Sequence, residues 1–211
     1  MRGPAGRCPN CSAPIQFRWS SAVQTVCDSC RSVVVRHDVD LETIGEVSDL
    51  PLDSSPIQLG TEGRFDNRSF TVIGRIVYEH DDGGWNEWHL AFADGSSGWL
   101  SDAQAEYAVS ALVPAPLPLP AADALAVGFR YMWQGQQLQV TTLTRARYAG
   151  VDGELPFEFW GKDEILFADL RCHDSTFATF DYSDSPPLLF VGRFVDYDDL
   201  SLRHVRTFDG W

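Results

Sequence analysis

The sequence predicts a mainly β protein, with a small N-terminal cysteine module followed by two tandem small antiparallel β-barrel or β-sandwich repeats. Three observations predict this class: two closely spaced cysteine pairs, apolar residues that alternate with polar ones, and turns rich in Gly and Asp between the alternating runs. The expected units are the cysteine module at 1–40, a linker at 41–57, a first β-repeat at 58–113, a Pro-rich linker at 114–122 and a second β-repeat at 123–211.

The cysteine module contains the most specific motif of the chain. Cys8-Pro-Asn-Cys11 and Cys27-Asp-Ser-Cys30 are two C-x2-C pairs separated by fifteen residues, a spacing typical of a four-thiolate zinc site. Residues 15–19 and 32–36 are predicted strands beside the hairpin that joins the pairs. We therefore predict a zinc ribbon that holds one structural zinc ion through Cys8, Cys11, Cys27 and Cys30. Iron, which also accepts tetrahedral sulfur ligands, and a redox dithiol pair are the alternatives.

Metal binding is expected to supply the folding energy of this ribbon. A module of about forty residues buries little apolar surface, whereas a structural zinc ion contributes on the order of 10 kcal/mol. We expect the ribbon to unfold without metal while the rest of the chain stays folded. Four thiolates leave no open coordination position, so a hydrolytic metal is not expected. Cys172, beside His173, is expected to be a plain thiol, because sequence neighbours rarely form a catalytic pair.

The charge distribution limits the classes of partner. The 211-residue chain has a formal net charge of -14. Residues 1–40 hold five arginines against three aspartates, whereas the remainder holds 11 basic against 27 acidic residues. An acidic body repels a phosphate backbone, so we do not expect it to bind nucleic acid. Ribbon-mediated nucleic-acid binding stays open, and it requires one shared face for Arg2, Arg7, Arg18, Arg31 and Arg36.

Two boundaries divide the rest of the chain. Residues 41–57 mix acidic residues, Ser and Pro without a regular period, which is typical of a linker. Four prolines alternate with Ala or Leu between residues 114 and 120, a pattern that favours an extended spacer.

The units on either side of this spacer match at an offset of 67, with residues 87–92 aligned on 154–159. This match indicates a tandem repeat.

Apolar alternation with a period of two predicts half-buried strands in both units. The alternating runs are 70–78, 88–92 and 155–159, and the expected hairpin turns are 82–84, 94–98 and 150–153. One short helix is predicted at 101–107, capped by Ser101 or Asp102.

Several segments resemble a known family. They are residues 54–63, Gly74-Arg75-Ile76-Val77-Tyr78, Gly84-Trp85-Asn86-Glu87-Trp88, Gly98-Trp99-Leu100-Ser101, Gly153-Glu154-Leu155-Pro156-Phe157 and Asp181-Tyr182-Ser183-Asp184. These segments resemble bacterial proteins that carry the domain of unknown function 4178, in the subgroup with an N-terminal zinc ribbon. The resemblance implies a β-rich, non-enzymatic domain whose relatives are often encoded beside polyamine-synthase-like enzymes and membrane proteins.

The expected function is a non-catalytic, zinc-binding adaptor or scaffold that presents an acidic, aromatic β-surface to a protein partner. Trp85, Trp88, His89 and Trp99 are the candidate recognition surface, since all four fall on one predicted hairpin. Core packing is the favoured interpretation of the same residues, because small β-barrels commonly fill their interiors with Trp and Phe. No catalytic residue is predicted, because phosphate-cradling glycine loops and serine-centred elbows are absent from the sequence.

A third function class also stays open, namely an accessory subunit or enzyme that acts on a cationic small molecule such as a polyamine. A desolvated polar cluster with shifted pKa values inside a cleft would favour it. The mean hydropathy of -0.17 and the lack of an apolar run of about 20 residues predict no membrane span. We expect a soluble cytoplasmic protein, since the N-terminus leads directly into the first cysteine pair without a signal-like segment.

Overall fold

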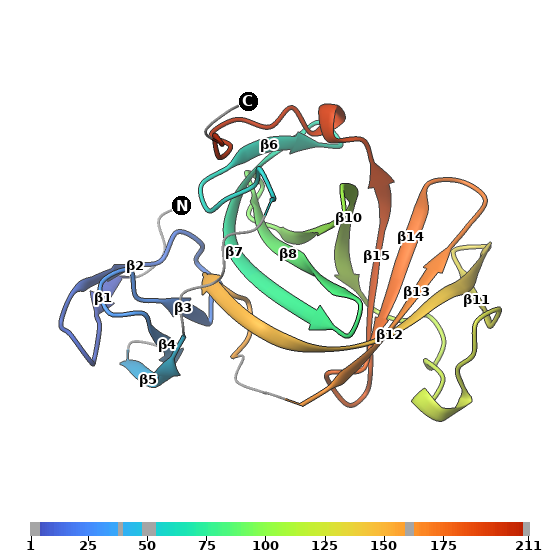
Figure 1. Ribbon diagram of the computed structural model, residues 1–211, viewed down its shortest axis with the longest axis horizontal. Coiled ribbons are helices and arrows are strands. Elements are labelled where there is room, and N and C mark those ends of the chain that lie inside the picture. The colour runs from blue at the N-terminus through green and yellow to red at the C-terminus, as the bar shows by residue number, and fades with distance from the viewer. Residues whose placement is uncertain (1–4, 38–39, 48–53, 159–162, 209–211) are drawn as a thin grey trace.

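The computed structural model describes residues 5–37, 40–47, 54–158 and 163–208 (Figure 1). The strands are β1 (Ala5–Arg7), β2 (Pro14–Gln16), β3 (Gln24–Val26), β4 (Ser32–His37), β5 (Asp40–Glu46), β6 (Glu62–Phe65), β7 (Arg68–His80), β8 (Gly83–Phe92), β9 (Ser97–Ala103), β10 (Glu106–Val113), β11 (Arg130–Trp133), β12 (Gln136–Gly153), β13 (Ile165–Arg171), β14 (Thr176–Asp181) and β15 (Leu188–Val195). Two short 3-10 helices, η1 (Ala122–Ala124) and η2 (Tyr197–Leu200), complete the elements of the described ranges. The mainly β class is confirmed, and no helix in these ranges has the length and apolar character needed to cross a membrane.

The N-terminal module consists of two small sheets, β1–β2 and β3–β4–β5. The strand expected at 32–36 is confirmed as β4, whereas β2 covers only the start of the strand expected at 15–19. The linker expected at 41–57 is wrong at its start, because residues 40–46 pair with β4 as strand β5. β5 thereby covers one edge of the valine-rich β4. Residues 48–53 of that linker lie outside the described residues.

The remaining strands form one ten-stranded antiparallel sheet, in the order β11-β12-β13-β14-β15-β10-β9-β8-β7-β6. β12 also pairs with β7, so eight of these strands close into a barrel, which Figure 1 shows beside the N-terminal module. The prediction of one small barrel or sandwich for each repeat is therefore wrong, because both halves contribute strands to a single barrel. Each half of the chain would leave unpaired strand edges on its own, and the halves satisfy these edges by pairing β10 with β15 and β7 with β12.

The two halves of the sheet begin with the same backbone geometry. Gly60 has a φ of 87° and its N–H donates to Val72 O at 2.8 Å, while Gly128 has a φ of 92° and its N–H donates to Val140 O at 2.8 Å. A β-bulge follows Val72 in β7 and Val140 in β12. The corresponding residues differ by 68 in number, one more than the offset of the sequence match.

Two local predictions are wrong. The helix expected at 101–107 is the end of β9, a tight turn and the start of β10. Its turn residues Gln104 and Ala105 both have positive φ, 51° and 68°, which is typical of a two-residue hairpin loop. The turn expected at 150–153 is the end of β12, whose pairing with β7 extends the strand where its glycines would allow a turn. At 150–153 pairing with the distant strand β7 decided the local structure, whereas 101–107 is a hairpin between the neighbouring strands β9 and β10.

The Pro-rich segment at 114–122 runs from β10 towards β11 and is attached to the sheet. Tyr131 Oη donates to Leu117 O at 2.9 Å, and Tyr182 Oη donates to Pro120 O at 2.8 Å.

The barrel wall is packed on both faces. One cluster around Trp88 and Leu90 lies outside it under β6, η2 and the flanking loops, and another around Tyr78 lies inside.

Candidate metal centre and ligand cavity

The structure brings the four cysteines of the ribbon together. The Sγ atoms of Cys8, Cys11, Cys27 and Cys30 all lie within 4.8 Å of one another. The Sγ–Sγ distance is 3.6 Å between Cys8 and Cys30 and 3.7 Å between Cys11 and Cys27. A disulfide would need about 2.05 Å, whereas thiolates at about 2.3 Å from one tetrahedral ion lie about 3.8 Å apart. The cluster is therefore a possible four-coordinate metal site, consistent with a zinc ribbon.

The two C-x2-C pairs lie in two tight turns of the same geometry. Ser12 N–H donates to Cys8 O at 2.8 Å, and Arg31 N–H donates to Cys27 O at 2.9 Å. Ser12 and Arg31, each directly after the second cysteine of its pair, have φ values of 64° and 60°. The left-handed residue reverses the chain, so that both sulfurs of a pair face the same point.

Polar groups surround the thiolate of Cys30. Ser32 Oγ lies 3.2 Å from Cys30 Sγ, within reach for its hydroxyl to donate to a metal-bound thiolate. Asn10 Nδ2 donates to Ser32 Oγ at 2.9 Å and to Glu46 Oε1 at 3.3 Å, which holds the hydroxyl in place. Donors of this kind orient metal ligands and stabilise their charge. The residues present therefore fit a metal ion.

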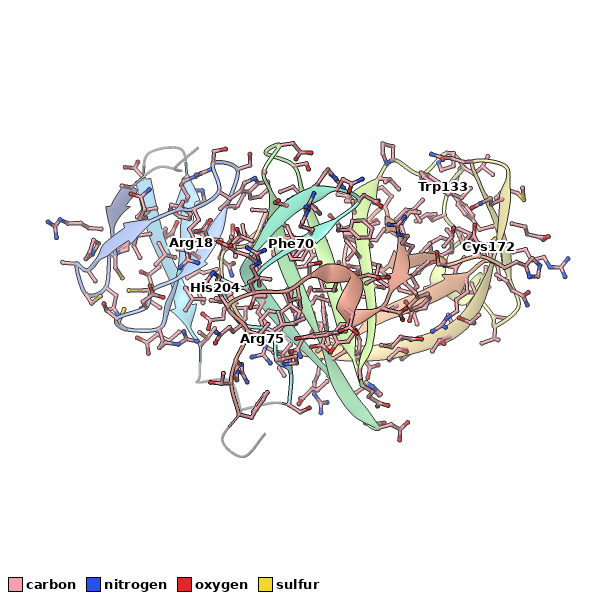
Figure 2. The ribbon with its side chains drawn as sticks, turned by 90° about the horizontal axis from the view of Figure 1, so that it is seen from above. Arg18, Phe70, Arg75, Trp133, Cys172 and His204 are labelled. Atoms are coloured by element: carbon pink, nitrogen blue, oxygen red, sulfur yellow. The ribbon has the colours of Figure 1, made fainter. Side chains whose placement is uncertain are left out.

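The ribbon is attached to the barrel through Glu154, whose side chain is 4% exposed. Its carboxylate accepts hydrogen bonds from the backbone N–H groups of Arg18 at 2.6 Å and Trp19 at 2.9 Å. Burial raises the pKa of Glu154, and the two backbone donors act against this shift. Figure 2 shows Arg18 at the junction between the ribbon and the barrel. Two further contacts, Leu155 N–H to Gln24 O at 2.9 Å and Arg31 Nη1 to Asp152 Oδ1 at 3.0 Å, strengthen this junction.

His89 connects the junction to the barrel interior. Its Nδ1–H donates to Glu154 O at 2.8 Å, and its ring lies between Trp19, at 5.1 Å, and Trp99, at 5.0 Å. Burial lowers the pKa of His89 to about 4, so the imidazole is neutral at physiological pH. Within the described part of the chain, its Nε2 has no hydrogen-bond partner.

The candidate recognition surface of Trp85, Trp88, His89 and Trp99 is not a surface. Trp88, His89 and Trp99 are 1%, 0% and 8% exposed. Trp85 is half-buried and stacks on Tyr78, with ring centroids 4.8 Å apart. The prediction of an exposed aromatic patch is wrong, and core packing is confirmed. Closure of the sheet covers one face of β8 and β9, whereas β6, η2 and the flanking loops cover the other.

The barrel encloses a polar and aromatic lumen. Two adjoining cavities, of about 60 and about 200 Å³, share the side chains of Glu87, Ser101, Phe167, Phe177 and Thr179 in their walls. Strand pairing sets Glu87 opposite Ser101 and places both on the inner face of the wall. Both are half-buried, and we assign their exposed area to the lumen that they line.

Three carboxyl groups from three strands face this lumen. Ser101 Oγ donates to both oxygens of Glu87 at 2.9 Å, and Trp85 Nε1 donates to Glu87 Oε1 at 3.0 Å. Thr179 Oγ1 donates to Asp169 Oδ1 at 2.8 Å. Removal from bulk water raises the pKa of Glu87 to about 8 and that of Asp169 to about 6, and it also raises the pKa of Asp181. The lumen is thus an acidic, desolvated site.

Sequence reasoning did not single out Glu87 or Asp169. A usable signal was present, since each carboxylate stands two residues after an aromatic residue, Trp85 or Phe167, in an alternating run. Residues two apart in a strand share a face. Which face becomes a lumen depends on closure of the sheet, and no short segment encodes that closure.

Other predicted residues are dispersed. Arg7 Nη1 donates to Ser12 O at 3.0 Å beside the cysteine turn, Arg36 Nη2 donates to Ser20 O at 3.0 Å, and Arg31 is paired with the barrel. This division does not favour the single basic face that nucleic-acid binding requires, and Arg2 lies outside the described residues. Cys172, labelled in Figure 2, is half-buried against an apolar cluster far from the ribbon.

The barrel coincides with a known family domain. The family described as domain of unknown function 4178 (DUF4178) matches residues 58–197, a segment that contains every strand from β6 to β15 and all three lumen carboxylates. The comparisons with curated proteins and with solved structures give no match. The ribbon precedes the matched segment, and the chain belongs to the DUF4178 family.

Proposed function

We propose that this chain is a non-catalytic binding protein, in which a zinc ribbon stabilises a barrel whose lumen is the ligand site. The observation that carries the proposal is the combination, inside one closed sheet, of a cavity of about 200 Å³ with carboxyl and aromatic side chains aimed into it. Small-molecule sites are typically concave and apolar, with a few placed polar groups. The desolvated acidic cluster is also the feature that favours a small-molecule ligand over an exposed docking surface.

A pair of substitutions on β10 tests the lumen as the site. Ala108 lines the larger cavity, whereas Ala111, three residues later, has the opposite parity and faces away from it. Ala108→Leu should abolish tryptophan-fluorescence changes on titration with small organic probes, because it fills the lumen. Ala111→Leu should leave the changes intact. Equal responses of the two variants, or no response of the wild type to a cation, an alcohol or a carboxylate of similar size, would overturn the proposal.

Zinc is the metal that we propose for the four-cysteine site, since tetrahedral thiolate coordination without an open position is typical of structural zinc. Such thiolates persist in a reducing compartment, which agrees with a cytoplasmic protein. Elemental analysis of the purified protein should give one zinc per chain. Iron at one per chain, with visible absorption, would assign the site to iron instead.

A protein partner is the second candidate. β11 is a free edge of the ten-stranded sheet, and exposed apolar side chains lie on it or next to it, namely Leu117 at 52%, Val127 at 64% and Met132 at 47%. An unpaired edge flanked by apolar groups can accept a strand from another chain. Met132→Lys should then abolish a partner interaction that Thr141→Lys, on the exposed part of β12, preserves.

We also propose that the two halves of the sheet are tandem copies of one five-stranded unit, β6–β10 and β11–β15. The 68-residue correspondence of Gly60 with Gly128 and Val72 with Val140, including their hydrogen bonds and bulges, supports this duplication. The β7–β12 junction also runs through corresponding positions, since Glu79 of β7 pairs with Arg147 of β12. A lumen formed between two copies would then receive its carboxylates from both.

A further inference from the structure

We propose that the lumen binds a small protonated aliphatic amine, with the Glu87 carboxylate as its counter-ion and the rings of Tyr78, Trp85 and Phe167 as its walls. This inference rests on the proposed function, which makes the lumen the ligand site, and it adds the chemical class of the ligand.

The charge balance of the cavity is negative. Glu87, Asp169 and Asp181 project into it from β8, β13 and β14. Among the described residues that line the two cavities, Arg171 is the permanent cation, and it is already engaged by Glu106, with 2.8 Å between Nη2 and Oε2. The charges that act most strongly on Glu87 are the other two carboxylates. The lumen therefore repels anions and favours a cation.

The carboxyl groups are held in position by neutral donors. Glu87 receives hydrogen bonds from a serine hydroxyl and an indole N–H, Asp169 from a threonine hydroxyl, and Asp181 from the backbone N–H of Ser183 at 2.7 Å. Such donors orient a carboxylate and supply no compensating charge. A buried carboxylate without a cationic partner carries a large desolvation penalty. An ammonium group has three donors and one positive charge, and so satisfies both needs at once.

The aromatic walls favour the same class of ligand. Tyr78 stacks on Trp85, and the Phe167 ring lies edge-on to both, at 5.0 Å from Tyr78 and 5.6 Å from Trp85. The negative faces of such rings attract organic cations, most strongly when ring and cation are both desolvated. The larger cavity, at about 200 Å³, is smaller than the roughly 300 Å³ at which pockets for drug-sized molecules begin. The ligand is therefore a short amine.

Binding of the ammonium ion should release a proton from Glu87. In the empty lumen near pH 7 the raised pKa, about 8, keeps Glu87 mostly protonated. The ammonium ion keeps its own proton, Glu87 loses one to solvent, and the ion pair in the complex is neutral. Affinity should rise about tenfold per pH unit below pH 8, then level off until an alkyl ammonium with a pKa of about 10.4 loses its proton.

Other titratable and charged groups face Glu87 from the strands around it and shape this profile. They are Tyr78 and His80 on β7, Glu106 on β10, Tyr148 on β12, Asp169 and Arg171 on β13, and Asp181 on β14. Burial raises the pKa of Asp169 to about 6, so its ionisation adds a second, shallower rise in affinity between pH 5 and 7.

Isothermal titration calorimetry of the metal-loaded full chain tests the proposal, with n-butylammonium chloride as the probe and n-butanol and sodium butyrate as matched comparisons. At pH 7, in two buffers of different ionisation enthalpy, butylammonium should bind with release of nearly one proton. Butanol should bind at least tenfold more weakly, and butyrate should not bind. Glu87→Gln, which preserves the shape of the side chain, should lower the affinity for butylammonium at least tenfold and abolish proton release.

Glu62→Gln on β6, which removes an equal charge outside the lumen, is the matched control and should bind as the wild type does. Asp169→Asn serves the same purpose as Glu87→Gln if the latter does not fold, with an expected threefold or greater loss of affinity at pH 8. Butanol binding as tightly as butylammonium, or binding without proton release, would overturn the ammonium assignment and leave the lumen as a site. Absence of binding by all three probes would instead remove the proposed function itself.

Discussion

At the scale of single residues, Glu87 has the most unusual environment among the described carboxyl groups of the lumen. It lies on the inner face of the barrel wall, it is held by Ser101 and Trp85, and the charges that act most strongly on it are carboxylates. A carboxyl group in this setting retains its proton near neutral pH. With its pKa raised to about 8, Glu87 is mostly protonated at pH 7 and becomes mostly ionised only above pH 8.

The stability of the empty protein should therefore depend on pH through Glu87. Its folded pKa of about 8 exceeds the ordinary value of 4.5, so the folded state binds this proton more tightly than the unfolded state. The stabilisation is complete below about pH 4.5 and is lost as pH rises towards 8. Urea unfolding at pH 5, 6, 7 and 8 should show a free energy of unfolding that falls less steeply in Glu87→Gln than in the wild type. Glu62→Gln should follow the wild type, and parallel curves for all three proteins would contradict the raised pKa.

Residue predictions from sequence succeeded where the geometry is local. Cys8 and Cys11 belong to one turn, as do Cys27 and Cys30, so spacing alone indicated that their sulfurs converge. The environment of Trp88 was not local in this sense. Trp88 is buried by β6, η2 and the flanking loops, which pack over the barrel wall. The alternation of apolar residues in β8 does not indicate which elements cover each face of the strand.

At the scale of elements, the β9–β10 hairpin has a turn with a conformational penalty. Gln104 and Ala105 both adopt positive φ, which side chains with a Cβ atom disfavour. Its sequence was also the reason that a helix was expected here, because no Asn-Gly or Gly-Gly pair marks the turn. Alternation predicted the preceding strand at 88–92, whereas β9, β10 and the turn between them were not predicted.

Ala105→Gly should stabilise the protein by about 1 kcal/mol, because glycine adopts a φ of 68° without steric strain. The shift in the urea unfolding midpoint measures this effect. Ala103→Gly, two residues earlier in the extended strand β9, should destabilise the protein instead, since it only increases the entropy of the unfolded chain. Equal effects of both substitutions would show that φ at position 105 is not strained.

In β15, a close contact with the backbone of another strand restricts residue 192 to glycine. A Cβ atom on Gly192 would lie 1.8 Å from Val109 O of β10, the strand with which β15 closes the barrel. Gly192→Ala should therefore destabilise the protein by about 2 kcal/mol or more, as measured by urea unfolding. Gly95→Ala is the comparison, because its Cβ would meet no atom within 4 Å and only its φ of 89° is unfavourable. A smaller loss for Gly192 than for Gly95 would contradict the close approach of β10 and β15.

At the scale of the whole molecule, the ribbon and the barrel share buried surface. Leu155 of the barrel is fully buried beneath β3, and Val26 of the ribbon belongs to the cluster that also contains Tyr78 and Trp99. From the sequence, the ribbon was expected to fold separately, because metal binding alone was expected to supply its folding energy. Their junction rests on backbone hydrogen bonds and on Glu154, which composition does not reveal.

Loss of the metal should therefore weaken both parts. Cys27→Ser, or chelation of the metal, should unfold the ribbon and also lower the thermal midpoint of the barrel by several degrees, because Leu155 and Glu154 lose their cover. Near-ultraviolet circular dichroism of the barrel tryptophans measures the second effect. Cys172→Ser is the control and should leave both transitions near their wild-type temperatures. A barrel midpoint that does not move in Cys27→Ser would show that the ribbon folds independently.

The pairing of distant strands also sets the order in which the chain can fold. The two junctions of the barrel join Glu79 to Arg147 and Ala111 to Val191, contacts that span roughly a third of the chain each. Closure of such long loops is slow, and topologies dominated by them fold slowly. During synthesis, β6 to β10 emerge well before β12 and β15 exist, so residues 74–79 of β7 and the outer edge of β10 are unpaired in the partial sheet. The nascent chain is therefore open to aggregation until its last strand is made, and a chaperone or the early docking of the ribbon would protect it over that interval.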